Sequence, residues 1–565
     1  MADEMNPIVS EEYADLLVES EGINSILQTY PDAIITPINY LISLVNIPVA
    51  LFTNQTISKL GYGAFPGYVG LVSQESLEAS GIVRLRNIPS LNLRGQGVLI
   101  GILDTGIDYT NPIFQNADGT TRIVSIWDQT IQSGNPPSGF LYGTEYTRDE
   151  INQALQSKTP FDIVPSKDEN GHGTMVAGIA GGNEVFESNF YGVAIQSEFV
   201  VVKMKTAKEY FKKFIFVPED AIVYQENDFS FALEYLVTVA TKLSKPLAIC
   251  IAASSPEGPH DGRGTLSTYL SLLASTPGIA CVLPAGNEGL ARRHYYGMPN
   301  EKSGKNLVEL NIGENASDFS MQLWGRQPNL YSVDIISPSG EYVPRLATRT
   351  SEFQEIRFIF EKTTIYVDYQ LMESQSSDPF IMFRFKDPAP GIWKFDVYEK
   401  GDLKQGFHIW LPMHGFISDN VYFIRPDPDT TILSLSTNPV SIVVTAYNYA
   451  DNSLYKEASR GYTRNGTISP QIAAPGVNVI GPTLDHTFTV FSGTSIATAH
   501  MTGVTAMLLE WGIVKGNLPN ISTVEMKILL ERGAKRDPDI SYPNRDWGYG
   551  ILDIYNVFDS LRTKE

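Results

Sequence analysis

Residues 97–106 read GVLIGILDTG, an unbroken apolar run that ends in an aspartate and a turn. A run of this kind is typical of a strand that is buried on both faces of a parallel sheet. Three further runs share its character: EFVVVKM at 198–204, PLAICIAAS at 246–254 and GIACVLPAGN at 278–287.

Helical patterns lie between these runs. Apolar residues repeat at helical spacing in DFSFALEYLVTVATKL at 228–243, and a second helix is predicted in TLSTYLSLLAST at 265–276. Alternating strands and helices predict an α/β fold in which helices flank a parallel sheet. In such sheets, ligands gather beyond the carboxyl ends of the strands.

The α/β pattern is interrupted between residues 306 and 434. Short runs there alternate apolar with polar residues, as in TIYVDY at 364–369 and FIMFRF at 380–385. This alternation predicts an inserted all-β domain, a sandwich or a jelly roll. The apolar run VSIVVTAYN at 440–448 then returns to the first pattern.

Composition narrows the class of protein. Of the 565 residues, 43% are hydrophobic and 19% are charged, which excludes an intrinsically disordered chain and an all-membrane chain. The formal net charge of -21 would repel a polyphosphate backbone, so no nucleic-acid partner is expected. Cys250 and Cys281 lie in apolar runs and are predicted to be buried thiols.

The N-terminal sequence bears on targeting. It opens acidic and lacks the basic and then apolar pattern of a secretory signal, so synthesis without export is expected. Residues 33–52 are uncharged and about as long as a membrane span. Pro37 and Pro48 would leave helical pieces too short to cross a bilayer, so no membrane span is expected.

Three motifs carry candidate chemistry, in the order Asp, His, Ser. Asp104 ends the first strand, His172 begins a small-residue helix in NGHGTMVAG, and Ser495 enters an apolar helix in GTSIATA. Taken singly, they also fit a turn cap, a surface histidine and a helix N-cap. Together they fit nucleophilic catalysis, because a serine hydroxyl needs a base for its proton and the base needs a carboxylate to fix its tautomer.

A fourth motif, PAGNEG at 284–289, follows the strand that contains Cys281. Its Asn287 can donate a side-chain amide to a tetrahedral oxyanion, alongside the N–H of Ser495 at a helix N-terminus. Alone, this motif is equally an ordinary turn.

These four motifs resemble those of subtilisin-like serine proteases, which share the order Asp, His, Ser. The resemblance extends from about residue 81 through the final GYGILDIYNVFDSL, apart from the insertion. It implies that Asp104 orients, His172 acts as general base and then acid, Ser495 attacks, and Asn287 stabilises the oxyanion.

The same resemblance suggests where a substrate would lie. Segment 252–258, AASSPEG, stands where the family keeps a Ser-Leu-Gly strand that pairs with extended substrate, and its proline cannot donate a ladder hydrogen bond. No pairing of substrate is therefore predicted on the S4 side of the cleft. Glu288 is expected near the S1 pocket. The predicted substrate-binding residues are Ser254, Ser255, Gly286 and Glu288.

By that likeness, residues 1–74 form an α/β pro-domain that acts as intramolecular chaperone and inhibitor. The linker from residue 61 would thread the active site and be cut after Gln74, the predicted autoprocessing residue. The alternative is an ordinary N-terminal domain that stays joined. The catalytic domain would then comprise residues 75–305 and 435–565, on either side of the 306–434 insertion.

The architecture as a whole resembles the germination-specific Csp-type subtilases of clostridial spores. That resemblance implies limited proteolysis of the pro-form of a spore-cortex hydrolase, with that protein and the chain's own pro-domain as partners. It implies association with the spore cortex or coat region, with the cytoplasm as the alternative. The insertion would either clamp the pro-domain to the catalytic domain or dock a protein substrate.

Two other functions remain open: a catalytically silent regulator that binds protein partners, and a general degradative subtilase. No cofactor or metal is expected. Asp108, Asp118 and Glu184 are the nearest candidate calcium ligands, but the family's calcium-loop pattern is not recognisable after the histidine helix. Solvated acidic loops are predicted there instead.

Overall fold

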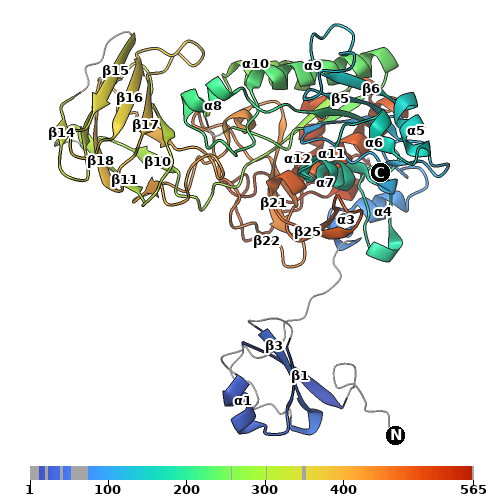
Figure 1. Cartoon of the computed structure of the whole chain (residues 1–565). Coiled ribbons are helices and arrows are strands. Elements are labelled where there is room, and N and C mark those ends of the chain that lie inside the picture. The colour runs from blue at the N-terminus through green and yellow to red at the C-terminus, as the bar shows by residue number, and fades with distance from the viewer. Residues whose placement is uncertain are drawn as a thin grey trace. The chain divides into compact units, whose positions relative to one another are not determined.

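The computed structural model describes residues 12–19, 23–37, 42–51, 74–255, 257–300, 302–345 and 351–562. The chain forms two compact units, Met1–Leu71 and Val72–Glu565 (Figure 1).

The first unit is a small α/β fold. Its antiparallel sheet has the strand order β1-β3-β2, and Ile26 of the helix is buried with Val45 and Ile47 of β3. Its elements are β1 (Tyr13–Glu19), α1 (Ile23–Thr29), β2 (Ile34–Pro37) and β3 (Ile42–Pro48). The predicted linker at 61–73 lies outside the described residues, and helix α3 (Gln74–Ala79) begins at the predicted autoprocessing residue.

The second unit is built on a mixed sheet with the order β22-β21-β9-β8-β4-β7-β5-β6, and β23 pairs with β21. Strands β4, β7, β8 and β9 are the four apolar runs of the sequence, and they pair in parallel. The α/β prediction is therefore confirmed. The strands are β4 (Leu99–Asp104), β5 (Ile123–Asp128), β6 (Thr144–Thr147), β7 (Glu198–Lys203), β8 (Leu247–Cys250), β9 (Ile279–Pro284), β21 (Ile442–Asn448), β22 (Ser453–Leu454) and β23 (Ile472–Pro475).

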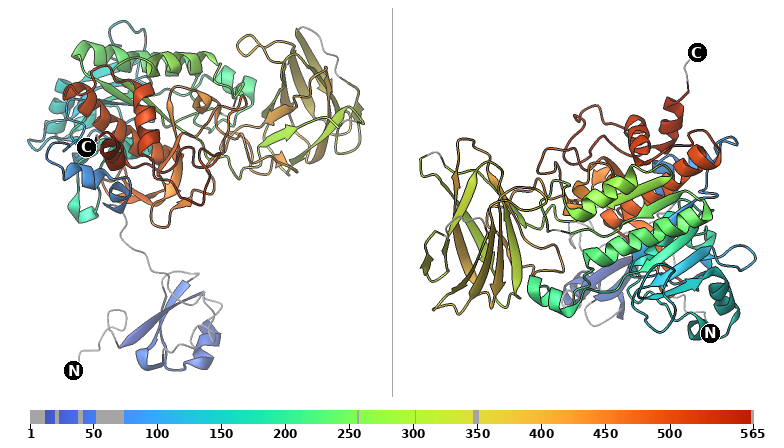
Figure 2. Two further views of the ribbon diagram at one scale, coloured as in Figure 1. Left: turned by 180° about the vertical axis from the view of Figure 1, so that it is seen from behind. Right: turned by 90° about the horizontal axis from the view of Figure 1, so that it is seen from above.

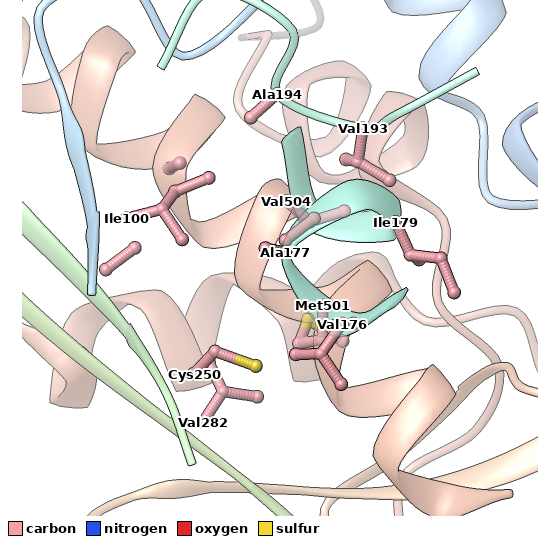
Figure 3. Close-up of a cluster of buried hydrophobic side chains, with 14 of the residues drawn as sticks. Ile100, Val176, Ala177, Ile179, Val193, Ala194, Cys250, Val282, Met501 and Val504 are labelled. Atoms are coloured by element: carbon pink, nitrogen blue, oxygen red, sulfur yellow. The ribbon is translucent and has the colours of Figure 1, made fainter. Parts of the chain in front are cut away.

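Side chains of β4 alternate between the two faces of this sheet. Leu99 and Leu103 pack in a core with α9 (Glu226–Leu243) and α10 (Thr265–Ala274), which run along one face (Figure 2). Ile100 and Ile102 pack on the opposite face with α7 (His172–Gly181) and α11 (Thr494–Leu509) (Figure 3). By the same alternation, Asp104 belongs to the face that α7 and α11 cover.

Six further helices of the unit are described. They are α4 (Ile82–Arg86), α5 (Arg148–Gln156), α6 (Pro160–Ile163), α8 (Glu209–Ile215), α12 (Thr523–Gly533) and α13 (Ile554–Ser560). Across the described ranges, no helix combines the length and the apolar character that a membrane span needs.

The insertion consists of two antiparallel sheets, with strand orders β10-β19-β12-β17-β16-β15 and β14-β13-β18-β11-β20 (Figure 1). Alternate residues of each strand point into one shared core, as the period of two predicts: Ile365 and Val367 of β16 pair with Phe385 and Phe383 of β17. The predicted inserted β domain is confirmed as part of the fold. Strand β10, which starts at His294, already belongs to its first sheet, whereas 306 is the start expected from the sequence.

The bounds of these strands are β10 (His294–Gly297), β11 (Lys305–Ile312), β12 (Phe319–Trp324), β13 (Leu330–Ile336), β14 (Tyr342–Val343), β15 (Ser351–Arg357), β16 (Thr364–Gln370), β17 (Phe380–Lys386), β18 (Gly391–Lys400), β19 (Phe407–Trp410) and β20 (Tyr422–Phe423).

Stacked rings lie where the insertion meets the α/β part. The imidazole of His260 stacks on Trp410 with 3.9 Å between centroids, and His294 and His408 stack on the same indole. Burial lowers the pKa of His294 to about 4, so this imidazole carries no charge near neutral pH. Burial likewise lowers the pKa of His408 well below its usual range, so these two imidazoles stack on Trp410 in the uncharged form.

Arg464 forms ion pairs across the same junction. Its guanidinium, 2% exposed, pairs with Asp261 of the α/β part at 3.1 Å and with Asp378 of the insertion at 2.7 Å. It also donates to the carbonyls of Pro259 and Gly325. A single buried cation thus connects the two parts.

We expect Arg464→Ala to lower the free energy of unfolding by about 3–5 kcal/mol, because two carboxylates lose their buried cation. Urea denaturation followed by tryptophan fluorescence measures the effect. Arg357→Ala is the matched control, since Arg357 is 77% exposed and its ion pair is with Glu355, a neighbour on its own strand. Equal midpoints for the two variants would contradict the assignment of Arg464 as the junction anchor.

Candidate active site

A buried carboxylate and a half-buried imidazole form the centre of the site. His172 Nδ1 lies 2.8 Å from Asp104 Oδ1 and 2.9 Å from Oδ2. The side chain of Asp104 is 5% exposed and that of His172 is 33% exposed. The negative charge of Asp104 raises the pKa of His172, burial opposes this shift, and the hydrogen bond to Asp104 and the charge of Asp168 support it.

Helix α7 reaches this carboxylate because glycine stands at position 173. A Cβ on Gly173 would lie 2.2 Å from the carbonyl oxygen of Gly106 and 3.1 Å from Asp104 Cβ. The glycine at 173 therefore lets the helix start touch the end of β4.

Ser495 and Asn287 lie together at the start of α11. Ser495 Oγ and Asn287 Nδ2 are 3.6 Å and 3.7 Å from the point where a Cβ on Gly493 would stand. Thr494 donates from its N–H at 3.1 Å and from its hydroxyl at 3.0 Å to Asn287 Oδ1. The amide oxygen is therefore held by the protein, and the amide N–H groups point away from it.

Sheet direction brings the two halves of the site to one edge. Asp104 ends β4 and Asn287 follows β9, and these strands run in parallel through β8. Gly493 N–H donates at 2.8 Å to the carbonyl of Gly476, just after β23, which is parallel to β21. The starts of α7 and α11 thus lie at the carboxyl edge of the sheet, where ligands are expected in such folds.

The hydroxyl of Ser495 is half-buried on the second residue of α11. Within the described part of the chain it makes no hydrogen bond, including none to His172. In proteins without substrate, the hydrogen bond between a nucleophile and its base is often long. The absence of this hydrogen bond is therefore compatible with both a catalytic and a silent site.

Of the predicted substrate-binding residues, Ser254 and Ser255 contact residues 434–436, at the end of the insertion. The N–H of Ser434 donates to the carbonyl of Ser255 at 2.7 Å, and Ser436 Oγ lies 3.4 Å from Ser254 Oγ. One acceptor for a substrate strand is therefore already bonded within the protein. Pro256 lies outside the described residues.

Gly286 and Glu288 flank Asn287. Gly286 has φ +109°, and a Cβ there would lie 2.6 Å from Leu433, so only glycine fits. Glu288 is buried, pairs with Arg293 at 3.1 Å and accepts from the N–H of His414 at 3.1 Å. Both of its carboxylate oxygens are thus bonded to residues at the junction with the insertion. The place of Glu288 near the S1 pocket stays a prediction.

The acidic residues considered for calcium each have a protein partner. Asp108 pairs with His486 at 2.8 Å, Glu184 pairs with Arg86 at 3.2 Å, and Asp118 accepts from Thr120 at 2.6 Å. Among the residues that the structure describes, no group of three or more His, Cys, Asp and Glu is arranged to hold a metal ion.

Sequence reasoning missed the hydroxyl and carboxyl groups that form hydrogen bonds to the site residues and to the segments beside them. Thr494 binds Asn287, and Thr105 accepts from the N–H of Gly173 at 3.0 Å and donates to Asp168 at 2.8 Å. Both threonines stand next to a predicted site residue, which is the signal that could have found them.

Comparisons with known proteins relate this arrangement to one family. The model of the subtilase family matches residues 95–228 and 427–550, which lie on either side of the β insertion. The solved structure of the CspB protease of Clostridium perfringens is 30% identical, with a TM-score of 0.76. The match covers 87% of this chain and 100% of that chain.

Curated proteins are more distant. The C5a peptidase of Streptococcus pyogenes serotype M3 is 20% identical over 450 residues, covering 74% of this chain and 35% of the relative. The subtilisin-like protease SBT3.6 of Arabidopsis thaliana is 29% identical over 108 residues, which are 18% of this chain and 14% of the relative. This chain therefore spans about a third of the length of the C5a peptidases that it matches.

The position of Glu288 gives a prediction about stability. Glu288→Gln should lower the free energy of unfolding by about 1–3 kcal/mol, because the buried guanidinium of Arg293 loses its charged partner. Urea unfolding measures it, and Glu355→Gln, in a solvent-exposed ion pair, is the control. A double-mutant cycle with Arg293→Met should recover a favourable coupling. Independent, additive effects of the two substitutions would refute the pairing.

Proposed function

Because the chain belongs to the subtilase family, we propose that it is a serine endopeptidase that cuts its own N-terminal segment and then activates a protein zymogen by limited proteolysis. The observation that carries the proposal is the Asp104–His172 pair at the carboxyl edge of the sheet where Ser495 and Asn287 also lie.

In this proposal, Ser495 Oγ attacks the scissile carbonyl carbon while His172 Nε2 takes the hydroxyl proton. The hydrogen bond from His172 Nδ1 to Asp104 supports that role, because it leaves Nε2 unprotonated and turned away from the carboxylate. The imidazolium then gives the proton to the leaving amine. Water attacks the acyl-enzyme in the second half-reaction, with His172 again accepting the proton.

The oxyanion would be stabilised by Asn287 and the start of α11. Thr494 holds Asn287 Oδ1, so that the amide can donate from Nδ2 to the carbonyl oxygen of a substrate held beside Ser495. The N–H of Ser495 lies in the first turn of α11, where helix N–H groups are unpaired and the potential is positive. Both donors are positioned before substrate arrives, which is the condition for electrostatic stabilisation of a transition state.

The narrower proposal rests on the similarity to the CspB protease. Residues 1–74 serve as the pro-domain, cleaved after Gln74, and the 306–434 insertion is part of the mature protein between catalytic segments 75–305 and 435–565. The zymogen is the pro-form of a spore-cortex hydrolase, and the protein is associated with the spore. The junction contacts of Arg464 and Glu288 favour a structural role for the insertion.

A second candidate is a silent regulator with the same fold. The absence of a hydrogen bond from Ser495 Oγ to His172 in the described structure is compatible with this candidate as well as with the protease. A regulator of this kind would bind its partner without turnover.

Replacement of the nucleophile separates these two candidates. Ser495→Ala should remain one full-length chain, whereas the wild type should give a new N-terminus after Gln74 by N-terminal sequencing. The physical reason is that alanine has no hydroxyl to attack the peptide bond. A wild-type chain that stays intact and does not react with a fluorophosphonate would support the regulator.

Loss of Asn287 tests the oxyanion role. Asn287→Ala should lower kcat by about 10²- to 10³-fold with little change in KM, since the donor acts mainly on the transition state. Steady-state hydrolysis of a chromogenic peptide measures both constants. Thr494→Val should produce a smaller loss by freeing the Asn287 amide. A wild-type rate for Asn287→Ala would remove this residue from the mechanism.

A further inference from the structure

Asp168 lies four residues before His172, in the sequence DENGH. Its carboxylate is buried, with 6% of the residue exposed, and it has no ion-pair partner among the described residues. A buried charge without a cation is costly, so such a group is retained where hydrogen bonds satisfy its oxygens. The donors that surround Asp168 therefore indicate what it holds.

Five hydrogen bonds converge on this carboxylate. Oδ1 accepts from the hydroxyl of Thr105 at 2.8 Å and from the N–H groups of Asn170 and Gly171 at 3.1 Å and 2.9 Å. Oδ2 accepts from Thr174 twice, from the N–H at 2.9 Å and from the hydroxyl at 2.7 Å.

These donors lie next to both members of the Asp104–His172 pair. Thr105 directly follows Asp104 at the end of β4, whereas Gly171 and Thr174 bracket His172 at the start of α7. Thr105 also accepts from the N–H of Gly173, which joins strand and helix directly. One carboxylate thus spans the two elements whose relative position sets the distance between Asp104 and His172.

We propose that Asp168 is a positioning residue of the active site, whose buried carboxylate holds the strand end that carries Asp104 against the helix start that carries His172. Its charge also acts on the imidazole. This inference deepens the proposed function and rests on it for the catalytic meaning of the pair.

The effect of the Asp168 charge on the pKa of His172 can be tested separately from its effect on geometry. Few titratable groups of the described structure lie around this imidazole. Asp104 and Asp168 both raise its pKa. Tyr224 lies close enough to feel both carboxylates, although burial is the largest cause of its raised pKa, so it stays neutral. Lys203, at the end of β7, is bonded to the carbonyl of Lys167 and lies 3.8 Å from Glu169.

Asp168→Asn removes the charge, and Glu169→Gln is the matched control, since Glu169 is adjacent in sequence but 82% exposed. Both are made in the Ser495→Ala chain, which needs no protease activity to be studied. The rate of His172 modification by diethyl pyrocarbonate, read by peptide mass spectrometry, reports the fraction of neutral imidazole at each pH. The midpoint should move to lower pH in Asp168→Asn and stay in place in Glu169→Gln.

In the active chain, Asp168→Asn should lower kcat by up to about 10²-fold with KM nearly unchanged. The acid limb of kcat/KM should move to lower pH with it. Thr105→Val, which keeps the charge but cuts the hydrogen bonds to Asp168 and from the N–H of Gly173, should lower kcat without moving that limb. This second variant also keeps the test informative if Asp168→Asn does not fold.

An unchanged labelling midpoint in folded Asp168→Asn would overturn the proposal, as would full activity in both Asp168→Asn and Thr105→Val. Failure of the proposed function gives a different result. A chain that never cleaves would still show the lower labelling midpoint, because the labelling measures the imidazole and not turnover.

Discussion

The hydrogen bond between the Asp104 carboxylate and the His172 imidazole is the interaction on which the rest of the molecule depends. It requires a buried strand to deliver a charged side chain at its last residue, and a helix to begin within contact of that residue. Parallel strands supply both conditions, since their carboxyl ends share one edge and their crossover helices start there. Alternation along β4 then selects the face, so Asp104 faces α7 and not α9.

The β insertion interrupts the catalytic fold in sequence without separating its parts in space. Residues 95–228 and 427–550 match one family model and form one sheet, although about two hundred residues of chain lie between them. The insertion meets that sheet through two different kinds of contact: stacked rings around Trp410, and buried ion pairs of Arg464 and Arg293. Ion pairs of a guanidinium require a defined geometry, whereas stacked rings bury a wide apolar surface. Together these contacts fix the orientation of the two parts and the distance between them.

Sequence reasoning predicted most of the fold, because each buried strand is a continuous apolar run and each half-buried strand alternates. It placed Asp104, His172, Ser495 and Asn287 at strand ends and helix starts, and the structure has them there. It could not find the partners of Glu288 or Asp168, because these bonds join residues whose proximity depends on the tertiary fold. The early start of the insertion at His294 was missed for a related reason, since β10 is short and pairs with β19, more than a hundred residues away.

The adjacency of Asn287 and Glu288 has a consequence for how such a protein can change over time. One peptide unit joins Asn287, the proposed oxyanion donor, to Glu288, whose carboxylate is bonded to Arg293 and to the N–H of His414. Because Gly286 on the other side has φ +109° and Leu433 leaves no room for a Cβ there, no other residue fits at that position. An exchange of the inserted domain for a different one would therefore have to preserve the contacts that Arg293 and His414 make with Glu288, or the neighbouring Asn287 amide would be displaced with it.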